Sequence, residues 1–223
     1  MPRNARQARR IHATLYLTTG FLFLSGVAVF AEGQHWIAAV FGGHVGAAVS
    51  HRWVGFLLIA AAGVIVVANP RSARRFLRDS FHFRRSDVWW FRSYPGFVLH
   101  PTRNTLPNHN NHFDPGQRVF NIVVVISLLV LSVTGLFMAF PRQFAPGVYA
   151  FNIRLHQIAT VVLLLSVIGH LVVATGLLPA YRGVWRAMHG NGEVPVRLAE
   201  ILWPGWTDRK APERRFDSRK DRA

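Results

Sequence analysis

The chain has 223 residues, 51% of them hydrophobic, and a formal net charge of +16 from 26 basic and 10 acidic side chains. Only 16% of its residues are charged, against roughly a quarter in an ordinary soluble domain. The basic residues flank long apolar runs and do not gather on one face of a soluble fold, and this distribution argues against a nucleic-acid-binding protein. The absence of cysteine excludes disulfides, thiolate-bound iron–sulfur clusters and covalent cofactor attachment of the CxxCH kind.

Four apolar runs lack acidic and basic side chains and have the length, about 20 residues, that spans a bilayer as a helix. Because a backbone in lipid must satisfy its own hydrogen bonds, each run is predicted to be helical. The first follows a basic start that resembles a signal peptide, but it lacks a clear small-x-small cleavage site and is predicted to be retained. The predicted spans are residues 11–31, 53–69, 119–140 and 155–178.

The arginines between the spans predict the orientation. Residues 1–10 contain four Arg and the connection 70–117 contains eight, whereas 31–50 contains neither Lys nor Arg. By the positive-inside rule, both termini and the loop 70–117 are cytoplasmic. The glycine-rich segment 33–50 is predicted to lie along the outer interface as a short helix and a loop.

The fold class is therefore predicted to be all-α, an integral membrane four-helix bundle with lipid as its surroundings. Residues 1–182 would form the transmembrane domain. Residues 183–223 would form a basic cytoplasmic tail, and its end, KAPERRFDSRKDRA, is expected to be disordered.

The histidines in or at the spans are the main functional signal, because ligand-type residues inside a membrane are functional candidates. His156 and His170 are 14 residues apart, about 1400° of helical rotation and so within about 40° of four turns, with a rise of about 21 Å. The topology puts His51 at the outer depth of His156 and His12 at the inner depth of His170. Two such pairs predict two six-coordinate haems suited to electron transfer.

Other interpretations remain open at this point. Any single histidine can be an interfacial hydrogen-bonding residue. A zinc-dependent intramembrane hydrolase would gather its ligands at one depth and usually add a carboxylate, whereas a haem-free anchor or small transporter would bind no haem at all. Small residues can let helices, or a flat macrocycle, approach closely, although ordinary helix contacts explain any one of them equally well. The glycines in the spans are Gly20, Gly26, Gly55, Gly63, Gly135 and Gly169.

The stretches RRIHATLYLTTGFLFLSGV, SHRWVGF, HFDPGQRVFN, RLHQIATVVLLLSVIGH and GVWRAMHGNGEV carry a resemblance over about residues 9–195. The chain resembles the gamma (cytochrome b) subunit of membrane-bound respiratory formate dehydrogenase. That family is related to the cytochrome b subunits of nickel–iron hydrogenases and thiosulfate reductases. The resemblance implies two haem b groups, the inner one bound by His12 and His170 and the outer one by His51 and His156.

The resemblance also implies a menaquinone pocket beside the inner haem. An Asn before the GQ motif and an inner haem ligand contribute to that pocket in the family. These positions correspond here to Asp114 and His170, with Gln117 as a further candidate. Because Asp replaces Asn, this side chain could accept the hydrogen bond or relay a proton, and Asp114 before Pro-Gly is an equally good helix cap. His109 and His112, in the same loop, could carry protons, but they are expected to be solvated.

A complex in the bacterial cytoplasmic membrane would follow from this resemblance. A molybdenum- or tungsten-pterin subunit would oxidise formate, and an iron–sulfur subunit would pass electrons through the outer and inner haems to menaquinone or ubiquinone, with protons taken from the cytoplasm. This chain would perform no formate chemistry. A hydrogenase or another molybdoenzyme as the electron donor is the alternative within the same class.

Overall fold

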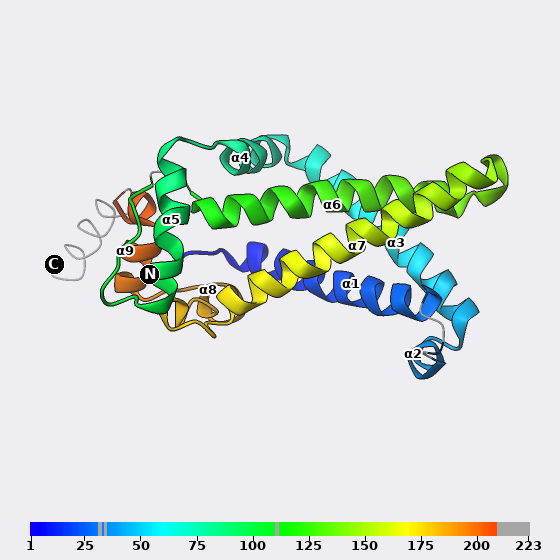
Figure 1. Ribbon diagram of the computed structural model, residues 1–223, viewed down its shortest axis with the longest axis horizontal. Coiled ribbons are helices and arrows are strands. Elements are labelled where there is room, and N and C mark those ends of the chain that lie inside the picture. The colour runs from blue at the N-terminus through cyan, green and yellow to red at the C-terminus, as the bar shows by residue number, and fades with distance from the viewer. Residues whose placement is uncertain (31–32, 34, 110–111, 209–223) are drawn as a thin grey trace. The chain divides into compact units, whose positions relative to one another are not determined.

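The computed structural model describes residues 1–208 except 31, 32, 34, 110 and 111. Over these residues its secondary structure is helical apart from one isolated antiparallel bridge between Pro2 and Glu193 (Figure 1). Among the described residues, four helices are long and apolar enough to cross a membrane, which confirms the predicted helical membrane bundle. They are α1 (Arg6–Phe30), α3 (His44–Ala68), α6 (Pro115–Ala139) and α7 (Pro146–Ala174). The shorter elements are α2 (His35–Val40), α4 (Pro70–Phe81), α5 (Ser86–Leu99), a 3-10 turn at Pro141–Gln143, another at Pro179–Tyr181, α8 (Arg186–His189) and α9 (Val196–Leu202).

The long helices begin before the apolar runs predicted from the sequence. The predicted spans start after Arg52 and Arg154, but a helix can continue past the membrane surface, where charged side chains are solvated. Gly43, at φ +96°, precedes the first residue of α3 in a backbone conformation that favours glycine. Pro115 and Pro146 stand at the first positions of α6 and α7, where a missing N–H costs no helical hydrogen bond.

The spans leave most of their apolar side chains exposed in the isolated chain. Val67 is 80% exposed, Leu57 67% and Leu129 61%. Apolar side chains at these exposures are unfavourable in water but suit contact with lipid tails. Hydrocarbon therefore takes the place of a protein core around most of the surface of these helices.

The connection 70–117, predicted as a loop, contains helices α4 and α5. The aromatic run of α5 buries Trp90 and Phe97, and Asp87 is buried in its first turn. Pro95 lies inside α5, where it cannot donate a backbone hydrogen bond. Burial of the aromatic side chains offsets this cost, a tertiary effect that local propensity does not predict.

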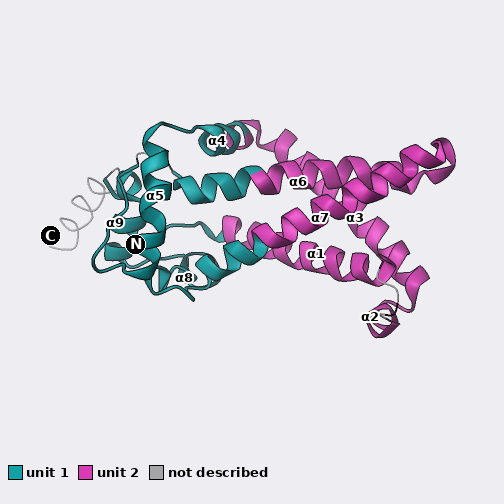
Figure 2. Ribbon diagram, viewed as in Figure 1, with its two compact units in different colours: residues 1–6, 74–122, 167–223 teal, residues 7–73, 123–166 magenta. Residues whose placement is uncertain are grey.

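The chain divides into two compact units (Figure 2). Unit 1 comprises residues 1–6, 74–122 and 167–223, and unit 2 comprises residues 7–73 and 123–166. Unit 2 contains α2, α3, nearly all of α1 and parts of α6 and α7. The domain boundary predicted at residue 182 falls within unit 1.

Unit 1 has an apolar core that includes much of the predicted tail. Its buried residues are Phe97, Ala180, Tyr181, Ala187, Val194, Ala199, Leu202, Trp203 and Trp206. The start of the chain packs here too: the N–H of Val194 donates to the Met1 carbonyl at 2.9 Å, and the Arg3 guanidinium lies 4.4 Å and 4.5 Å from the ring centres of Trp203 and Trp206. The predicted tail is thus folded as far as residue 208, and its end, expected to be disordered, lies outside the described residues.

Candidate functional site

In unit 2 the structure brings together His51 on α3 and His156 on α7. Their ring centres are 6.3 Å apart and the ring planes make an angle of 68°. The two residues are far apart in the sequence, and the matched depth expected from the topology accounts for their meeting. His51 lies two turns inside α3, and not just before a helix as the predicted span would place it.

Each of these rings is held by a hydroxyl group from another helix. The Nδ1 of His51 lies 3.0 Å from Oγ of Ser25 on α1, and the Nδ1 of His156 lies 2.8 Å from Oγ1 of Thr134 on α6. Ser25 donates its hydroxyl proton to the Phe21 carbonyl at 2.8 Å, and Thr134 donates to the Val130 carbonyl at 2.7 Å.

Because both hydroxyl protons are used in this way, the hydroxyl oxygens accept from the imidazoles. Nδ1 therefore carries the proton in both rings, and the lone pair of each ring is on Nε2. A metal-ligating histidine is commonly oriented through its second nitrogen in this manner. Ser25 and Thr134 were not among the residues predicted from the sequence.

A glycine follows each of these hydroxyl residues and leaves room for the imidazole. A Cβ added at Gly26 would lie 3.3 Å from Cε1 of His51, and one at Gly135 would lie 3.6 Å from Cε1 of His156. The first distance is tighter than an ordinary contact, so Gly26 allows α1 to approach this ring. Of the six glycines in the predicted spans, these two contact the candidate ligands.

The His51–His156 pair fits the axial ligation of one haem. Two imidazoles on opposite sides of one metal ion, each bonded at about 2 Å, have ring centres about 6 Å apart. The lone pair of each ring is on Nε2, and Gly26 and Gly135 leave the room that the two imidazoles occupy. The described residues contain no group of three or more His, Asp or Glu that could hold a metal ion, so a two-ligand haem suits the pair better than a closed zinc site does.

His12 and His170 belong to different units, and their pairing stays a prediction. In unit 2 the ring of His12 lies 6.0 Å from that of Tyr16. In unit 1 the ring of His170 stacks on Phe120, with centres 4.4 Å apart and planes 9° apart. This stacking fixes the plane of the His170 ring.

Asp114 caps α6. Its Oδ1 accepts a hydrogen bond from the backbone N–H of Gln117 at 2.8 Å, which confirms the capping interpretation. Gly116 is required beside it, because a Cβ there would lie 3.1 Å from the Trp90 ring. The DPGQ motif thus provides a cap, a proline at the first helical position and a residue without a side chain against an indole.

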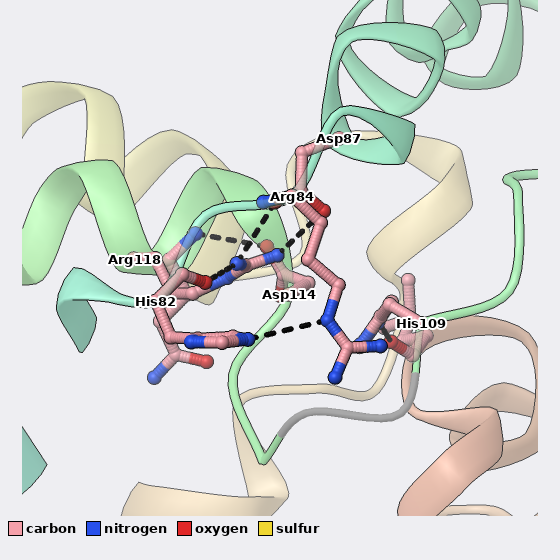
Figure 3. Close-up of polar contacts among 8 residues, drawn as sticks. His82, Arg84, Asp87, His109, Asp114 and Arg118 are labelled. Carbon is pink, nitrogen blue, oxygen red and sulfur yellow. Dashed lines mark hydrogen bonds and ion pairs between the residues drawn. The ribbon is translucent and has the colours of Figure 1, made fainter. Parts of the chain in front are cut away.

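A buried ion pair lies close to this helix start (Figure 3). Arg118 donates from NH1 and NH2 to the two carboxylate oxygens of Asp87 at 3.0 Å and 2.9 Å. The Arg118 side chain is fully buried, and it also donates to the His82 carbonyl. Burial by itself would raise the pKa of Asp87, but hydrogen bonds from Arg118 and from the Arg84 N–H, at 2.7 Å, hold this pKa below its usual value.

The expectation that His109 is solvated is wrong. Its side chain is 8% exposed, and its Nε2–H donates to the Leu202 carbonyl at 2.9 Å. Nδ1 is buried and has no hydrogen-bond partner within the part of the chain that the structure describes. The segment around α9 covers this loop, and nothing local in the sequence indicates that contact. His112 is exposed, as expected.

Asp114, Tyr94 and Tyr181 influence one another electrostatically. Burial raises the pKa of Asp114, and the backbone N–H of Gln117 offsets this only in part. Burial also raises the pKa of Tyr181 far above its usual value, and the negative charge of Asp114 raises it further. The pKa of Tyr94 is raised by burial in the same way. Titratable groups thus surround the start of α6 in unit 1, where a proton could be held.

Comparison with known proteins identifies the family. The model of the family described as prokaryotic cytochrome b561 matches residues 3–191, which is most of the chain. A search of curated proteins found no match. A bundle of membrane-spanning helices with a His51–His156 pair suited to axial ligation agrees with the family match. The chain belongs to the prokaryotic cytochrome b561 family and is a multi-pass bacterial inner-membrane protein of the haem b electron-transfer type.

Proposed function

We propose that this chain is the di-haem b membrane subunit of a respiratory formate dehydrogenase complex. It would pass electrons from an iron–sulfur subunit to menaquinone or ubiquinone, with protons taken from the cytoplasm. The observation that carries this proposal is the His51–His156 pair, because the ring centres lie 6.3 Å apart and a hydroxyl group at each Nδ1 leaves the lone pair of each ring on Nε2.

In this proposal His51 and His156 hold the outer haem. The two histidines would hold the haem iron through Nε2, and bound haem b would supply one-electron transfer. Ser25 and Thr134 fix the ring orientation, and Gly26 admits the His51 edge. Fixed ligands keep the reorganisation on electron transfer small, which suits a relay better than a catalytic centre.

The inner haem is proposed to use His12 and His170. Helix α7 runs without interruption from Pro146 to Ala174, so His156 and His170 are separated by about 21 Å along one helix. In a bilayer whose hydrocarbon core is about 30 Å thick, this rise would put the second ligand near the opposite surface. The stack of Phe120 on His170 supports a fixed ring at that depth.

The quinone is proposed to bind at the start of α6, with Asp114, Gln117 and His170 as contacts. A raised pKa lets the Asp114 carboxyl keep a proton closer to neutral pH than an ordinary aspartate does. Both a carboxylic acid and the Asn amide of the resembling family can donate a hydrogen bond to a quinone carbonyl, but only the acid can also give up its proton. Tyr94 and Tyr181, beside Asp114, add hydroxyl groups to a proton route from the cytoplasm.

The partners in this proposal rest on the resemblance to the formate dehydrogenase gamma subunit. An iron–sulfur subunit would dock on the outer side, near the His51–His156 pair, and a molybdenum- or tungsten-pterin subunit would oxidise formate. The absence of cysteine from this chain agrees with iron–sulfur clusters held elsewhere. Orientation with both termini in the cytoplasm rests on the distribution of arginine.

Haem counting tests the core of the proposal. A pyridine haemochrome assay on the purified chain should give two haem b per polypeptide, and one or none would reject the di-haem assignment. His156→Ala should remove chiefly one haem and His12→Ala chiefly the other. If His12→Ala retains both haems with unchanged spectra, the pairing of His12 with His170 is wrong.

The donor is tested in native membranes. Formate should reduce both haems in membranes that contain the intact complex, and the purified chain should bring with it an iron–sulfur and a pterin subunit. Reduction by hydrogen and not by formate, with a copurifying hydrogenase, would assign the chain to that complex instead. An alkaline phosphatase fusion after Ala223 should be inactive, and an active one would reverse the orientation.

A further inference from the structure

A second pair of histidines lies in unit 2, away from His51 and His156. His35 is the first residue of α2 and His44 is the first residue of α3. Nε2 of His44 lies 3.5 Å from Nδ1 of His35, and the ring centres are 5.6 Å apart. Both side chains are exposed, so the pair is open to an ion from solution.

The ring of His44 is already oriented by the backbone. Its Nδ1 lies 2.7 Å from the Ala28 carbonyl in the last turn of α1. A carbonyl can only accept, so Nδ1–H donates and the lone pair of His44 is on Nε2, the atom that faces His35. A carbonyl bound to the second nitrogen is the usual support of a metal-ligating histidine.

The spacing of the two nitrogens suits a shared ion better than a direct bond. At 3.5 Å an N–H···N hydrogen bond between them is long, beyond the usual range of about 2.7–3.2 Å for strong protein hydrogen bonds. Two imidazole nitrogens bound to one tetrahedral zinc at about 2.0–2.1 Å are about 3.3 Å apart. A shift of a few tenths of an ångström in one exposed ring would reach that value.

We propose that His35 and His44 form a binding site for one divalent transition-metal ion of the Zn²⁺ or Cu²⁺ kind, with water completing its coordination. Imidazole suits both ions, and Cu²⁺ binds more tightly than Zn²⁺ to a given nitrogen site. Two imidazole ligands leave the remaining coordination positions of such an ion to water. An open site of this kind would bind an ion reversibly and not as a permanent structural metal.

A bound ion would link the start of α2 to the start of α3. His44 precedes His51 by seven residues on α3, so the two lie on nearly the same face, about 10 Å apart along the axis. The His35–His44 site is therefore a separate site close to the proposed outer haem, and its existence does not depend on the haem assignment. The ion would hold α2 against the helix that carries His51.

Calorimetric titration with Zn²⁺ tests the site on the purified full-length holoprotein in detergent, with an affinity tag that contains no histidine. Wild type should bind one Zn²⁺ per chain. His35→Ala and His44→Ala should each weaken binding at least tenfold, whereas His100→Ala, a change at an exposed histidine outside the pair, should not. If His35→Ala binds Zn²⁺ as tightly as wild type, the proposal fails.

Electron paramagnetic resonance with Cu²⁺ identifies the ligands directly. One equivalent of Cu²⁺ should give a signal with hyperfine structure from two imidazole nitrogens, and His35→Ala should reduce this to one. His44→Ala also removes the hydrogen bond to Ala28, so His35→Ala is the variant that separates metal loss from a local change in fold. An unchanged two-nitrogen signal in His35→Ala would place the ion elsewhere and reject the site.

Discussion

Removal of the Asp87 carboxylate should destabilise the α4–α5 region more than any surface change, because Arg118 would remain buried without a counter-ion. The Arg118 side chain is fully buried, and both of its NH groups donate to Asp87, at 2.9 Å and 3.0 Å. Loss of one partner of a buried ion pair costs about 3–5 kcal/mol. Asp87→Ala would therefore raise the opening equilibrium of this region by about two to nearly four orders of magnitude, at about 1.4 kcal/mol per factor of ten.

Hydrogen exchange measures this opening region by region. Amides of residues 84–99 should lose protection in Asp87→Ala, while those around the His51–His156 pair in unit 2 should change little. The double variant Asp87→Leu/Arg118→Met should recover much of the protection, since replacing a buried pair by apolar side chains is often neutral or stabilising. A change below tenfold in Asp87→Ala, or a double variant less protected than the single one, would refute the reasoning.

The pH dependence of this ion pair follows from the lowered pKa of Asp87. A carboxylate whose pKa is lower in the folded protein contributes stability above its unfolded pKa, about 3.9, and loses it as the pH falls through the lower folded value. Protection of residues 84–99 should therefore be flat between about pH 5 and 8. It should fall only in acid, below the ordinary aspartate range.

Three further predictions concern the haem ligands, the quinone site and the chain start. Ser25→Ala and Thr134→Val each remove a hydroxyl that accepts from a histidine Nδ1–H. Each should weaken retention of one haem by about 10- to 100-fold, measured as haem transfer to apomyoglobin. Unchanged transfer would exclude a supporting role. In wild type, the rate of quinone reduction should fall as the pH rises through the Asp114 pKa. Asp114→Asn should keep the cap but abolish this fall, whereas Asp114→Ala also loses about 1 kcal/mol of capping. A wild-type pH profile in the Asn variant would show that Asp114 is only a cap. Arg3→Ala removes contacts with two indoles, worth about 1–2 kcal/mol together, and should increase exchange at residues 192–206, an effect that Arg3→Lys should reproduce only in part.

The helices and the meeting of His51 with His156 could be predicted from the sequence because both depend on regular geometry. Apolar length defines a span, and alternating direction of the spans assigns His51 and His156 to one depth. The Asp-Pro-Gly signal before α6 is also local, and Asp114 is a cap as its position indicates. These features need only the periodicity of a helix and the order of the spans along the chain.

The contacts between distant segments could not be predicted in this way. Asp87 and Arg118 are 31 residues apart, and nothing in either neighbourhood selects the other as its partner. His109 looked solvated because its own loop is polar, yet the segment that ends at Leu202 buries it. Unit 1 is built from three separate stretches of the chain, so its core emerges only when those stretches are assembled.

The hydroxyl–glycine pairs form an intermediate case that helical geometry explains. Ser25-Gly26 lies on α1 beside His51, and Thr134-Gly135 lies on α6 beside His156. Adjacent residues on a helix are related by a rotation of about 100° and a rise of about 1.5 Å. The hydroxyl side chain can therefore bind Nδ1, while the next residue, a glycine, leaves room for Cε1, the neighbouring ring atom. Two adjacent atoms of each imidazole are then fixed by one dipeptide, and Nε2 beyond them is left for a ligand. The sequence therefore contains a recognisable pattern, Ser-Gly or Thr-Gly in one span beside a histidine in another. Once the depth of each histidine is known, this pattern indicates which dipeptide supports which imidazole.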